Sequence, residues 1–386
     1  MWYKSKTAYL FAFYFLYFII FIMIKFLSKI NQKKLRGVAI LRLDFNTEDF
    51  WRIDASLPTI KYLKKYADKI LIISHKGRPD GFDKKLSLKN NALYLEKKLK
   101  TKINFIPHFD FSKIKKQIEN YPKKSIFVLE NIRFLKEEQS PKLKLAKKLA
   151  ELGNYFVNDA FAVSHRSQNS VTGIPKFLPS YAGLELEKEI FYLNHILKNP
   201  KKPLVLILGG AKASDKLGVI KNFYKKANWI LIGGASANTL LFLSGENIYD
   251  SLCEKDEKIL KELKQILKFK NVLIPLDSKI NNNQILDIGP KTIELFKEKI
   301  NQAKTIVWSG PLGMIEKKPY DKGSLEIARA IIKNKNALTI VGGGETVMFL
   351  KKNKLDKKIK FISTGGGAML EFLSGKKLPG IEALNN

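Results

Sequence analysis

The sequence predicts an α/β fold with two doubly wound parallel sheets, and three observations support this prediction. Short apolar runs such as Leu204–Leu208 lack polar alternation, as expected of strands that are buried on both faces. Segments with helical spacing separate these runs, which is the alternation of strand and helix that parallel sheets need. Glycine turns or polar side chains follow the runs directly, so binding groups are predicted at the carboxyl edge of each sheet.

The length of the chain predicts two domains, because 386 residues exceed the size at which single cores stop growing, about 250–300 residues. The stretch ELEKEIFYLNHILK has helical spacing without strand character, so we interpret it as a connecting helix. The single cysteine, Cys253, excludes a disulfide framework and fits a reducing, cytoplasmic location. We expect an N-terminal segment at 1–30, a first domain at 31–184, the connecting helix at 185–200, a second domain at 201–365 and a C-terminal tail at 366–386.

Four strands are predicted in the first half, and polar residues follow each of them. They are VAILRLDFN from Val38, KILIIS from Lys69, SIFVLE from Ser125 and YFVNDAF from Tyr155. A short linker is predicted to reach Arg52. The next segment, SLPTIKYLKKYA, has helical spacing after a Ser-x-Pro start.

The second half repeats this pattern with a glycine turn after most strands. The predicted strand segments are PLVLILGG, NWILIGG, NVLIPLD, KTIVWSGPLG, ALTIVGGG and KFISTGGG. After the first of them, Ser214 or Asp215 is predicted to cap a helix, with Lys212 just before it and Lys216 in its first turn. Two ammonium groups beside a helix N-terminus predict a phosphate site. The alternative is an ordinary strand-turn-helix corner with two solvated lysines.

The charge is strongly basic, since 69 lysines and arginines against 36 acidic residues give +33. Such a charge ordinarily suggests nucleic acid or an anionic membrane surface. Only seven of the basic residues are arginine, and isoleucine, asparagine, phenylalanine and tyrosine are abundant, so we interpret the excess lysine as a coding bias. No specific nucleic-acid partner is therefore predicted. Each arginine is informative, because a guanidinium group makes planar, bidentate contacts that lysine cannot.

An uncharged, aromatic-rich stretch of 17 residues lies at 8–24, which is at the short limit for a membrane span. The downstream flank is the more basic side, so a span here would leave the rest of the chain in the cytoplasm. The alternative is that Met23 is the true start. Both interpretations leave the predicted fold unchanged.

Basic side chains collect at the predicted strand ends of the first half. Because loops at the carboxyl edge of a doubly wound sheet converge, this set predicts a site for a small, highly anionic molecule. Asp44 and Asn46 are expected to be free to bond its hydroxyl groups. For any single arginine the alternative is a surface ion pair, and catalysis by the histidines is not expected. The set comprises Arg52, Arg78, Arg133, Arg166, His75 and His165.

The second half offers glycine turns in place of a single nucleotide-binding motif, since neither a Walker A sequence nor G-x-G-x-x-G occurs. Backbone N–H groups at these turns are predicted to bind a nucleotide. Glu316 is placed to accept bonds from ribose hydroxyls and Glu345 to lie near a metal-phosphate complex; a solvated surface position is the alternative for each. The turns are Gly209-Gly210, Gly233-Gly234, Gly342–Gly344 and Gly365–Gly367.

These segments together resemble the phosphoglycerate kinase family from about Val38 to Leu384. The resemblance rests on many ordered motifs: LRLDFN, RIDASLPTIKYL, SHKGRPDG, LENIRF, VNDAFAVSHR, LGGAKASDKLGVI, LDIGPKTIELF, VWSGPLGMIE, VGGGETV and ISTGGGAMLEFLSGKKLPGIEAL. It implies reversible phosphoryl transfer from 1,3-bisphosphoglycerate to Mg-ADP, giving 3-phosphoglycerate and ATP. It also implies a monomer with a triose-binding first domain, a nucleotide-binding second domain, a hinge that closes and a tail that returns to the first domain.

The resemblance implies a role for each matching residue. The expected triose-binding set is Asp44, Asn46, Arg52, His75, Arg78, Arg133 and Arg166. Arg52 and Lys212 resemble the pair that stabilises the transferring phosphoryl group. The expected nucleotide contacts are Gly210, Lys212, Lys216, Gly234, Glu316, Gly343, Gly344, Glu345 and Thr346, with Glu345 also at the Mg²⁺ ion and Gly365, Gly366 and Gly367 as a phosphate loop.

The chain departs from the family pattern at several places. The Asn46–Arg52 loop is short, and the segment from Asp277 to Asp287 lacks a long insertion that typically carries a tryptophan. The substituted positions are Gln168, Ala235, Ser309 and Glu345. Because Arg52, Lys212 and Lys216 are retained, we interpret these departures as a pared-down sequence and not an inactive one. The alternative to an active kinase is a non-catalytic descendant that binds anions or nucleic acid through its lysine-rich surface.

Overall fold

The computed structural model describes residues 24–47 and 49–385, which divide into two compact units. The first unit comprises the chain up to Lys188 together with 377–386, and the second comprises 189–376. The hydrophobic stretch at 8–24 lies outside the described residues except for Ile24, and the alternative start at Met23 lies outside them as well. Among the helices of the described ranges, none has the length and apolar character needed to cross a membrane.

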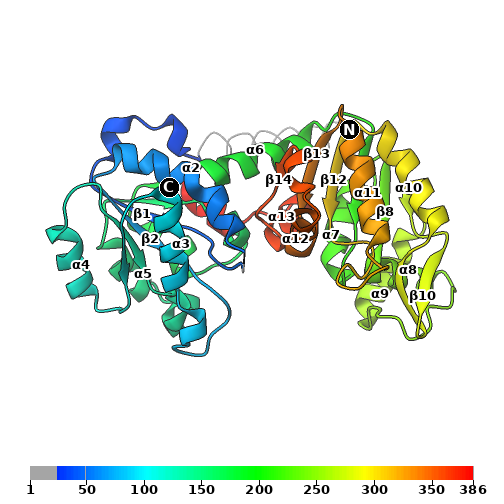
Figure 1. Ribbon diagram of the computed structural model, residues 1–386, viewed down its shortest axis with the longest axis horizontal. Helices are drawn as coiled ribbons and strands as arrows, with labels where there is room; N and C mark the ends of the chain where they lie inside the picture. The colour runs from blue at the N-terminus through cyan, green and yellow to red at the C-terminus, as the bar shows by residue number, and fades with distance from the viewer. Residues whose placement is uncertain (1–23, 48, 386) are drawn as a thin grey trace, which may run out of the picture. The chain divides into compact units, whose positions relative to one another are not determined.

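The first unit is built on a six-stranded parallel sheet in the order β3-β4-β2-β1-β5-β6 (Figure 1). Helices cover the sheet, and strand β1 is buried along almost its whole length. The strands are β1 Val38–Arg42, β2 Lys69–Ile73, β3 Ile103–Ile106, β4 Ile126–Leu129, β5 Tyr155–Asn158 and β6 Ser180–Ala182. The helices are α2 Trp51–Tyr66, α3 Lys89–Leu99, α4 Phe111–Asn120, α5 Lys144–Ala150 and the start of α6 Leu184–Lys198.

The predicted strands of this unit are all present, but the sheet has two more. Strand β3 is only partly buried, and β6 is three residues long, so neither forms the continuous apolar run by which the other four were found. Both lie at the edges of the sheet, where one neighbour suffices.

The prediction of a linker up to Arg52 and a helix start near Ser56 is wrong. Helix α2 begins at Trp51, and Pro58 lies in its interior. The buried side chains of Ile53, Ile60 and Leu63 hold this helix against the core, which offsets the lost hydrogen bond and the clash of an internal proline, about 3 kcal/mol. As a result, Arg52 lies in the first helical turn and not on a loop.

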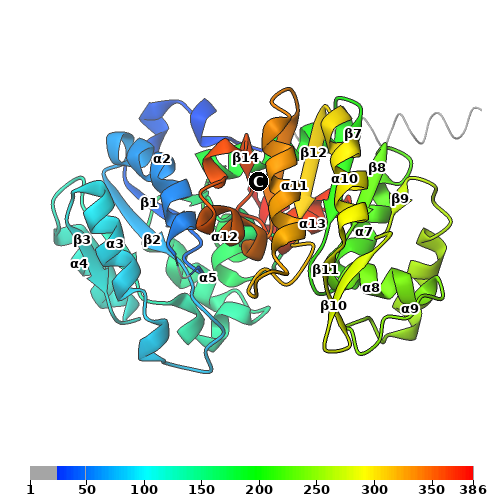
Figure 2. The same ribbon diagram turned by 45° about the vertical axis from the view of Figure 1, so that its right-hand side comes forward.

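The second unit repeats the architecture with the sheet order β14-β13-β12-β7-β8-β9. Helices α10 and α11 pack together on one face of this sheet, and α7 packs with α13 on the other (Figure 2). The strands are β7 Leu204–Leu208, β8 Trp229–Ile232, β9 Val272–Leu273, β12 Thr305–Ser309, β13 Leu338–Gly342 and β14 Phe361–Ile362. The helices are α7 Ser214–Phe223, α8 Gly234–Leu243, α9 Glu257–Ile266, α10 Pro290–Gln302, α11 Lys322–Lys333, α12 Gly344–Lys352 and α13 Gly367–Leu373.

All six predicted strands of the second unit are confirmed, and one feature was not predicted. A hairpin of β10 Ser278–Asn281 and β11 Gln284–Ile288 forms a separate two-stranded antiparallel sheet. Its turn residues Asn282 and Asn283 both have positive φ, as a tight hairpin turn requires. The hairpin occupies the segment between Asp277 and Asp287 that the sequence marked only as short.

Residues 377–386 belong to the first unit, whereas 366–376, which were expected in the tail, belong to the second. Short helix α14 Pro379–Glu382 places the Gly380 N–H 2.7 Å from the carbonyl oxygen of Ser164, and Asn158 Nδ2 donates to the Gly380 carbonyl at 3.1 Å. A Cβ at Gly380 would lie only 2.7 Å from Val171 Cγ1, so this approach requires glycine. The tail thereby packs against the loop that follows β5.

Candidate active site

The first unit brings Arg52 and Asp44 together at the carboxyl end of β1. Arg52 Nη1 donates to Asp44 Oδ2 at 2.6 Å, and the Asn46 backbone N–H donates to Asp44 Oδ1 at 2.9 Å. Asn46 Oδ1 in turn accepts the Gly77 N–H at 2.7 Å. Burial raises the pKa of Asp44, but Arg52, His75, the Asn46 N–H and Arg42 outweigh it, so the net shift is downward. Asp44 and Asn46 thus already accept hydrogen bonds that hold this edge together, and their contact with ligand hydroxyls stays a prediction.

Arg42 is a member of this cluster that the sequence analysis missed. It ends β1, is fully buried, and donates from Nε to Ser170 Oγ at 2.9 Å and from Nη1 to the Leu43 carbonyl. Its Nη2 lies 3.2 Å from His75 Nδ1. An arginine inside an otherwise apolar strand was the available signal, but the prediction considered only side chains beyond the strand ends.

Arg133 adds a guanidinium group with unused hydrogen-bonding capacity. Its Nη1 donates to the Gly77 carbonyl, while its buried Nε and Nη2 have no partner within the part of the chain that the structure describes. Burial lowers the pKa of Arg133 to about 10, and the positive charges of Arg166 and Arg42 add to this effect. A site that gathers guanidinium groups despite their repulsion is suited to a multiply charged anion.

The remaining predicted residues of this unit fall into two groups. Arg166 is half-buried, lies within electrostatic reach of Arg133 and His75, and donates from Nε to His165 Nε2 at 3.2 Å. Arg78 is exposed in the loop after β2 and has no hydrogen-bond or ion-pair partner among the described residues. The structure thus gathers Asp44, Arg52, His75, Arg133 and Arg166 but does not bring Arg78 into contact with them.

In the second unit, glycine turns after three strands interlock through their backbones. Gly210 N–H donates to the Pro311 carbonyl at 2.8 Å, and Gly234 N–H donates to the Leu312 carbonyl at 3.0 Å. Gly210 and Gly310 have φ near +90°, and a Cβ at Gly310 would lie 2.2 Å from the Gly209 carbonyl oxygen. Only glycine permits this approach, so the turns form one rigid backbone surface.

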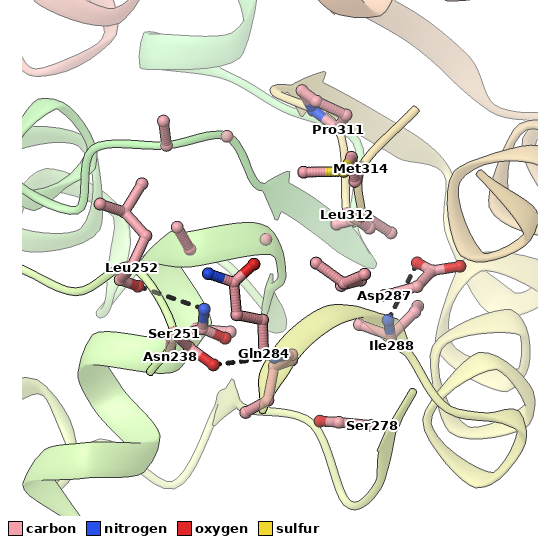
Figure 3. Close-up of a pocket in the computed structure, with 18 of the residues that line it drawn as sticks. Asn238, Ser251, Leu252, Ser278, Gln284, Asp287, Ile288, Pro311, Leu312 and Met314 are labelled. Carbon is pink, nitrogen blue, oxygen red and sulfur yellow. Dashed lines mark hydrogen bonds between the residues drawn. The ribbon is translucent and has the colours of Figure 1, made fainter. Parts of the chain in front are cut away.

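This surface forms one side of a pocket that the β10–β11 hairpin closes on the other (Figure 3). Asn238, Gln284 and Ser251 supply polar groups to the lining, and Leu312 and Met314 supply apolar ones. The Ile285 N–H donates to Ser251 Oγ at 2.8 Å, which ties the hairpin to the loop between α8 and α9. A mixed, concave lining of this kind suits the base and ribose of a nucleotide. Of the predicted residues, Gly210, Gly234, Glu316 and Glu345 line it.

The two predicted lysines differ in their surroundings. Lys212 is exposed on the loop before α7, whereas Lys216 is buried in the first turn of that helix. Burial lowers the pKa of Lys216, and the negative charges of Asp215 and Glu345 oppose this shift. The predicted side-chain cap is wrong, because Ala213 occupies the N-cap position and makes no such bond. The free N–H groups of this helix end remain available to an anion.

The other predicted residues of this unit are not among those that line the pocket. Thr346 is fully buried, and its Oγ1 accepts the Gly310 N–H at 3.0 Å, so it supports the turn. Gly343 has φ of +93° and precedes α12. A Cβ at Gly344 would meet no atom within 4 Å. Residues Gly365–Gly367 precede α13, and the N–H of Gly365 donates to Ser363 Oγ at 3.0 Å.

Asp287 is a second residue that sequence reasoning missed. It lines the pocket, and its carboxylate accepts the N–H groups of Ile288 at 2.9 Å and Gly323 at 2.7 Å (Figure 3). A Cβ at Gly313 or Gly323 would lie within 2.3 Å of Asp287 Oδ1, so two glycines make room for this carboxylate. Burial raises the pKa of Asp287 to about 6. The aspartate directly before the Ile-Gly-Pro of the motif LDIGP was the available signal.

A cluster of guanidinium groups suited to an anion on one doubly wound unit, and a pocket suited to a nucleotide on the other, fit the class of phosphotransferases, which move a phosphoryl group between a small anionic substrate and a nucleotide. Comparison with known proteins identifies the family. The phosphoglycerate kinase family model matches residues 36–376, and the chain belongs to the phosphoglycerate kinase family. Its function is the glycolytic phosphoryl transfer of that family, and the non-catalytic alternative is not favoured.

Individual relatives agree over nearly the whole chain. The phosphoglycerate kinase of Dictyoglomus turgidum is 39% identical, with 94% of this chain and 99% of the relative covered. That of Thermosipho africanus is 41% identical, with 90% and 94% covered. The solved phosphoglycerate kinase structure from Pyrococcus horikoshii has a TM-score of 0.82 and 30% identity, with 94% and 98% covered, and that from Coxiella burnetii has 0.78 and 34%, with 93% and 98% covered.

Proposed function

We propose that the two units divide the substrates of this kinase: the first binds 3-phosphoglycerate or 1,3-bisphosphoglycerate, and the second binds ADP or ATP. One observation carries this proposal, namely the buried guanidinium cluster with unpaired N–H groups on Arg133 and Arg52. An oxyanion ligand would satisfy those donors and offset the repulsion among the arginines. The pocket between the glycine turns and the hairpin supports the nucleotide half of the proposal.

The proposed triose-phosphate contacts are Arg52, His75, Arg133 and Arg166, with Arg78 reaching in from its exposed loop and with Asp44 and Asn46 holding the edge. The proposed nucleotide contacts are the backbone at Gly210, Gly234, Gly343 and Gly344 and the side chains of Lys212, Lys216 and Glu316. Thr346 acts through the Gly310 turn. Gly365, Gly366 and Gly367 remain candidates for a phosphate loop.

Arg52 and Lys212 are proposed to stabilise the phosphoryl group during transfer. Phosphoryl transfer requires little covalent chemistry from a protein, and its rate depends on positioning and on neutralising charge at the equatorial oxygens. Arg52 is held by Asp44 at 2.6 Å, so it is positioned before substrate binds. Lys212 is exposed, and an ammonium group on a flexible four-carbon chain can be oriented by a bound nucleotide.

Magnesium is proposed to enter with the nucleotide. Among the described residues, no group of three or more histidine, cysteine or acidic side chains forms a metal centre. Mg²⁺ commonly binds through one or two carboxylates together with substrate phosphates and water, and the exposed Glu345 in the pocket lining fits such a single-carboxylate contact. The bound ion would neutralise phosphate charge.

The replacement of Arg52 or Lys212 by alanine tests the proposed transfer role. We expect kcat to fall by about 10²–10³, as when a single preorganised charge donor is removed elsewhere, while KM for both substrates changes less. Steady-state kinetics in the direction of ATP formation would measure both constants. A rise in KM with unchanged kcat would show that the two residues only bind substrate. Lys333, at the end of α11, is a control position outside both sites.

We also propose a cytoplasmic, monomeric enzyme that residues 8–24 tether to the cytoplasmic face of the membrane. The uncharged character of that stretch and its basic flank support this proposal. Fractionation of the full chain, with mass spectrometry of its N-terminus, tests the tether. Recovery of residues 8–24 in a protein that stays in the soluble fraction would contradict it.

A further inference from the structure

A buried carboxylate lies behind the arginine cluster and is not part of the proposed substrate contacts. Glu138, in the short 3-10 helix η5 Lys136–Gln139, is fully buried. Its Oε1 accepts the hydroxyl proton of Ser170 at 2.5 Å, and its Oε2 accepts the Ser170 backbone N–H at 3.0 Å. Ser170 lies in the π-helical turn η7 Asn169–Gly173, so Glu138 holds a segment 32 residues further along the chain.

Ser170, held by Glu138, in turn accepts a hydrogen bond from Arg42. Because the single hydroxyl proton of Ser170 goes to Glu138, its oxygen is left to accept, and Arg42 Nε donates to it at 2.9 Å. The Leu43 carbonyl accepts from Nη1 of the same guanidinium group. Arg42 is fully buried, so it acts on its neighbours rather than on solvent. Its charge is balanced by Glu138 and Asp44.

The next contact determines which nitrogen of His75 carries the proton. A guanidinium group donates hydrogen bonds and cannot accept them. With Arg42 Nη2 at 3.2 Å, His75 Nδ1 must therefore be the acceptor. Asp44 Oδ1 is 3.7 Å from Nδ1, which is too far to accept a proton there. In a neutral ring the one remaining N–H is on Nε2, and no described residue accepts a hydrogen bond from it.

The charge around His75 keeps the ring neutral. Burial lowers its pKa well below the usual range, and the positive charges of Arg42, Arg133 and Arg166 act in the same direction, while Asp44 opposes them. A neutral imidazole with its proton on Nε2 is a hydrogen-bond donor without a formal charge. It is neither a general base toward the cluster nor an additional cation.

We propose that Glu138 and Ser170 are positioning residues, which act through Arg42 to hold His75 as a neutral Nε2–H donor for the bound triose phosphate. This inference rests on the proposed assignment of the arginine cluster as the glycerate site. Neither residue was a candidate from the sequence, because Ser170 and Arg42 are 128 positions apart.

The test uses the full chain labelled with ¹⁵N at its four histidines, and His75→Gln assigns the His75 signals. We expect unprotonated Nδ1 and protonated Nε2 for His75, with no titration between about pH 5.5 and 8. In Ser170→Ala, the link between Glu138 and Arg42 is lost, so we expect mixed tautomers or a titration within that range. A protonated Nδ1 in the parent protein, or unchanged signals in Ser170→Ala, would overturn the proposal.

Kinetics provide the second readout. Ser170→Ala and Glu138→Gln should raise KM for 3-phosphoglycerate about 10-fold, since a hydrogen bond to a charged group is misplaced, and should leave KM for ATP unchanged. Glu137→Gln, at the exposed neighbouring position, is the matched control and should change neither constant. Unchanged KM in Ser170→Ala despite an altered His75 spectrum would overturn the positioning role. Unchanged KM in His75→Gln itself would instead contradict the glycerate site, which separates the two failures.

Discussion

The two candidate sites of this protein differ in whether side chains or backbone groups form their surface. In the first unit, side chains carry the binding surface, and several of them are buried charges: Arg42 is 0% exposed and Arg133 is 6% exposed. In the second unit, the backbone of the glycine turns forms the surface, and the charged groups Lys212 and Glu345 are exposed. The side chains of the first candidate site are therefore held by buried contacts, whereas the second combines a hydrogen-bonded backbone surface with exposed charged side chains.

This difference follows from the chemistry of the two proposed ligands. A small phosphate-bearing acid has few atoms, so its specificity must come from guanidinium groups at set positions, and those are costly to bury together. A nucleotide is larger, and its phosphates are bound with a metal ion, so close backbone approach matters more than side-chain charge. The two sites should consequently respond differently to substitution.

The largest effect expected on substrate binding concerns the buried charges of the first unit. Arg133→Ala removes a donor with two unpaired N–H positions, so we expect KM for 3-phosphoglycerate to rise about 10- to 100-fold, the value of a charged hydrogen bond. The thermal midpoint without ligand should not fall, because repulsion with Arg166 and Arg42 is relieved. Arg329→Ala, at an exposed ion pair with Glu326, is the control. A large loss of stability without a change in KM would contradict the comparison.

The second prediction concerns the backbone surface that the glycine turns of the second unit form. Gly234 has φ of +61°, and a Cβ there would lie 2.9 Å from both Gly210 N and the Pro311 carbonyl oxygen. Gly234→Ala should lower the free energy of unfolding by about 2 kcal/mol or more, through backbone strain and this clash, and weaken ADP binding. Gly245 has φ of +92° with nothing within 4 Å, so Gly245→Ala isolates the strain alone. Calorimetric titration with ADP and denaturant unfolding measure both effects; equal behaviour of the two variants would exclude the close approach as the cause.

The third prediction concerns buried carboxyl groups that lie outside the arginine cluster. At the start of α6, burial raises the pKa of Asp159 to about 6 and that of Glu185 to about 7, with the charge of Asp159 contributing to the latter. Both values lie above the usual range of about 4 for an unfolded chain. The folded state therefore binds more protons, and the free energy of unfolding should decrease as pH rises from about 4 to 7.

Asp159→Asn and, in the second unit, Asp287→Asn should each flatten this dependence below pH 6, by about 1–2 kcal/mol over the range. The amide oxygen of asparagine retains an acceptor for the Glu185 and Gly323 N–H groups, respectively. Denaturant unfolding at several pH values between 4.5 and 8 provides the measurement. If the dependence of the free energy of unfolding on pH is unchanged in both variants, the pKa values of these carboxyl groups are not raised in the folded protein.

The smallest effect is expected at the exposed charge of the nucleotide site. Glu345→Asp shortens a side chain that is solvent-exposed and bound to no described residue by an ion pair, so activity with Mg²⁺ should stay within about threefold, or improve, because Mg²⁺ keeps several bound waters through which a shorter carboxylate can still contact it. Steady-state rates across a magnesium titration test this. Complete loss of activity would show that the second site, like the first, requires its charged side chains at set positions.

Much of the fold and part of the site were predictable from local pattern. Six apolar runs of the second half became strands, because buried parallel strands need an uninterrupted apolar sequence. Edge strands β3 and β6 and the β10–β11 hairpin were missed, since partial burial and short length remove that signal. The start of α2 was misplaced for another reason: packing of Trp51 and Ile53 outweighs the helix-breaking tendency of Pro58.

By itself, the sequence determined which side chains reach the carboxyl edges of the two sheets, because strand polarity and loop position are local properties. Only the tertiary structure decided which of them touch. It pairs Asp44 with Arg52, leaves Arg78 apart, and joins Glu138, Ser170, Arg42 and His75 into one chain of contacts. The physical reason is that these contacts depend on the packing of segments far apart in sequence, where burial and hydrogen-bond geometry set the partners and no local periodicity encodes them.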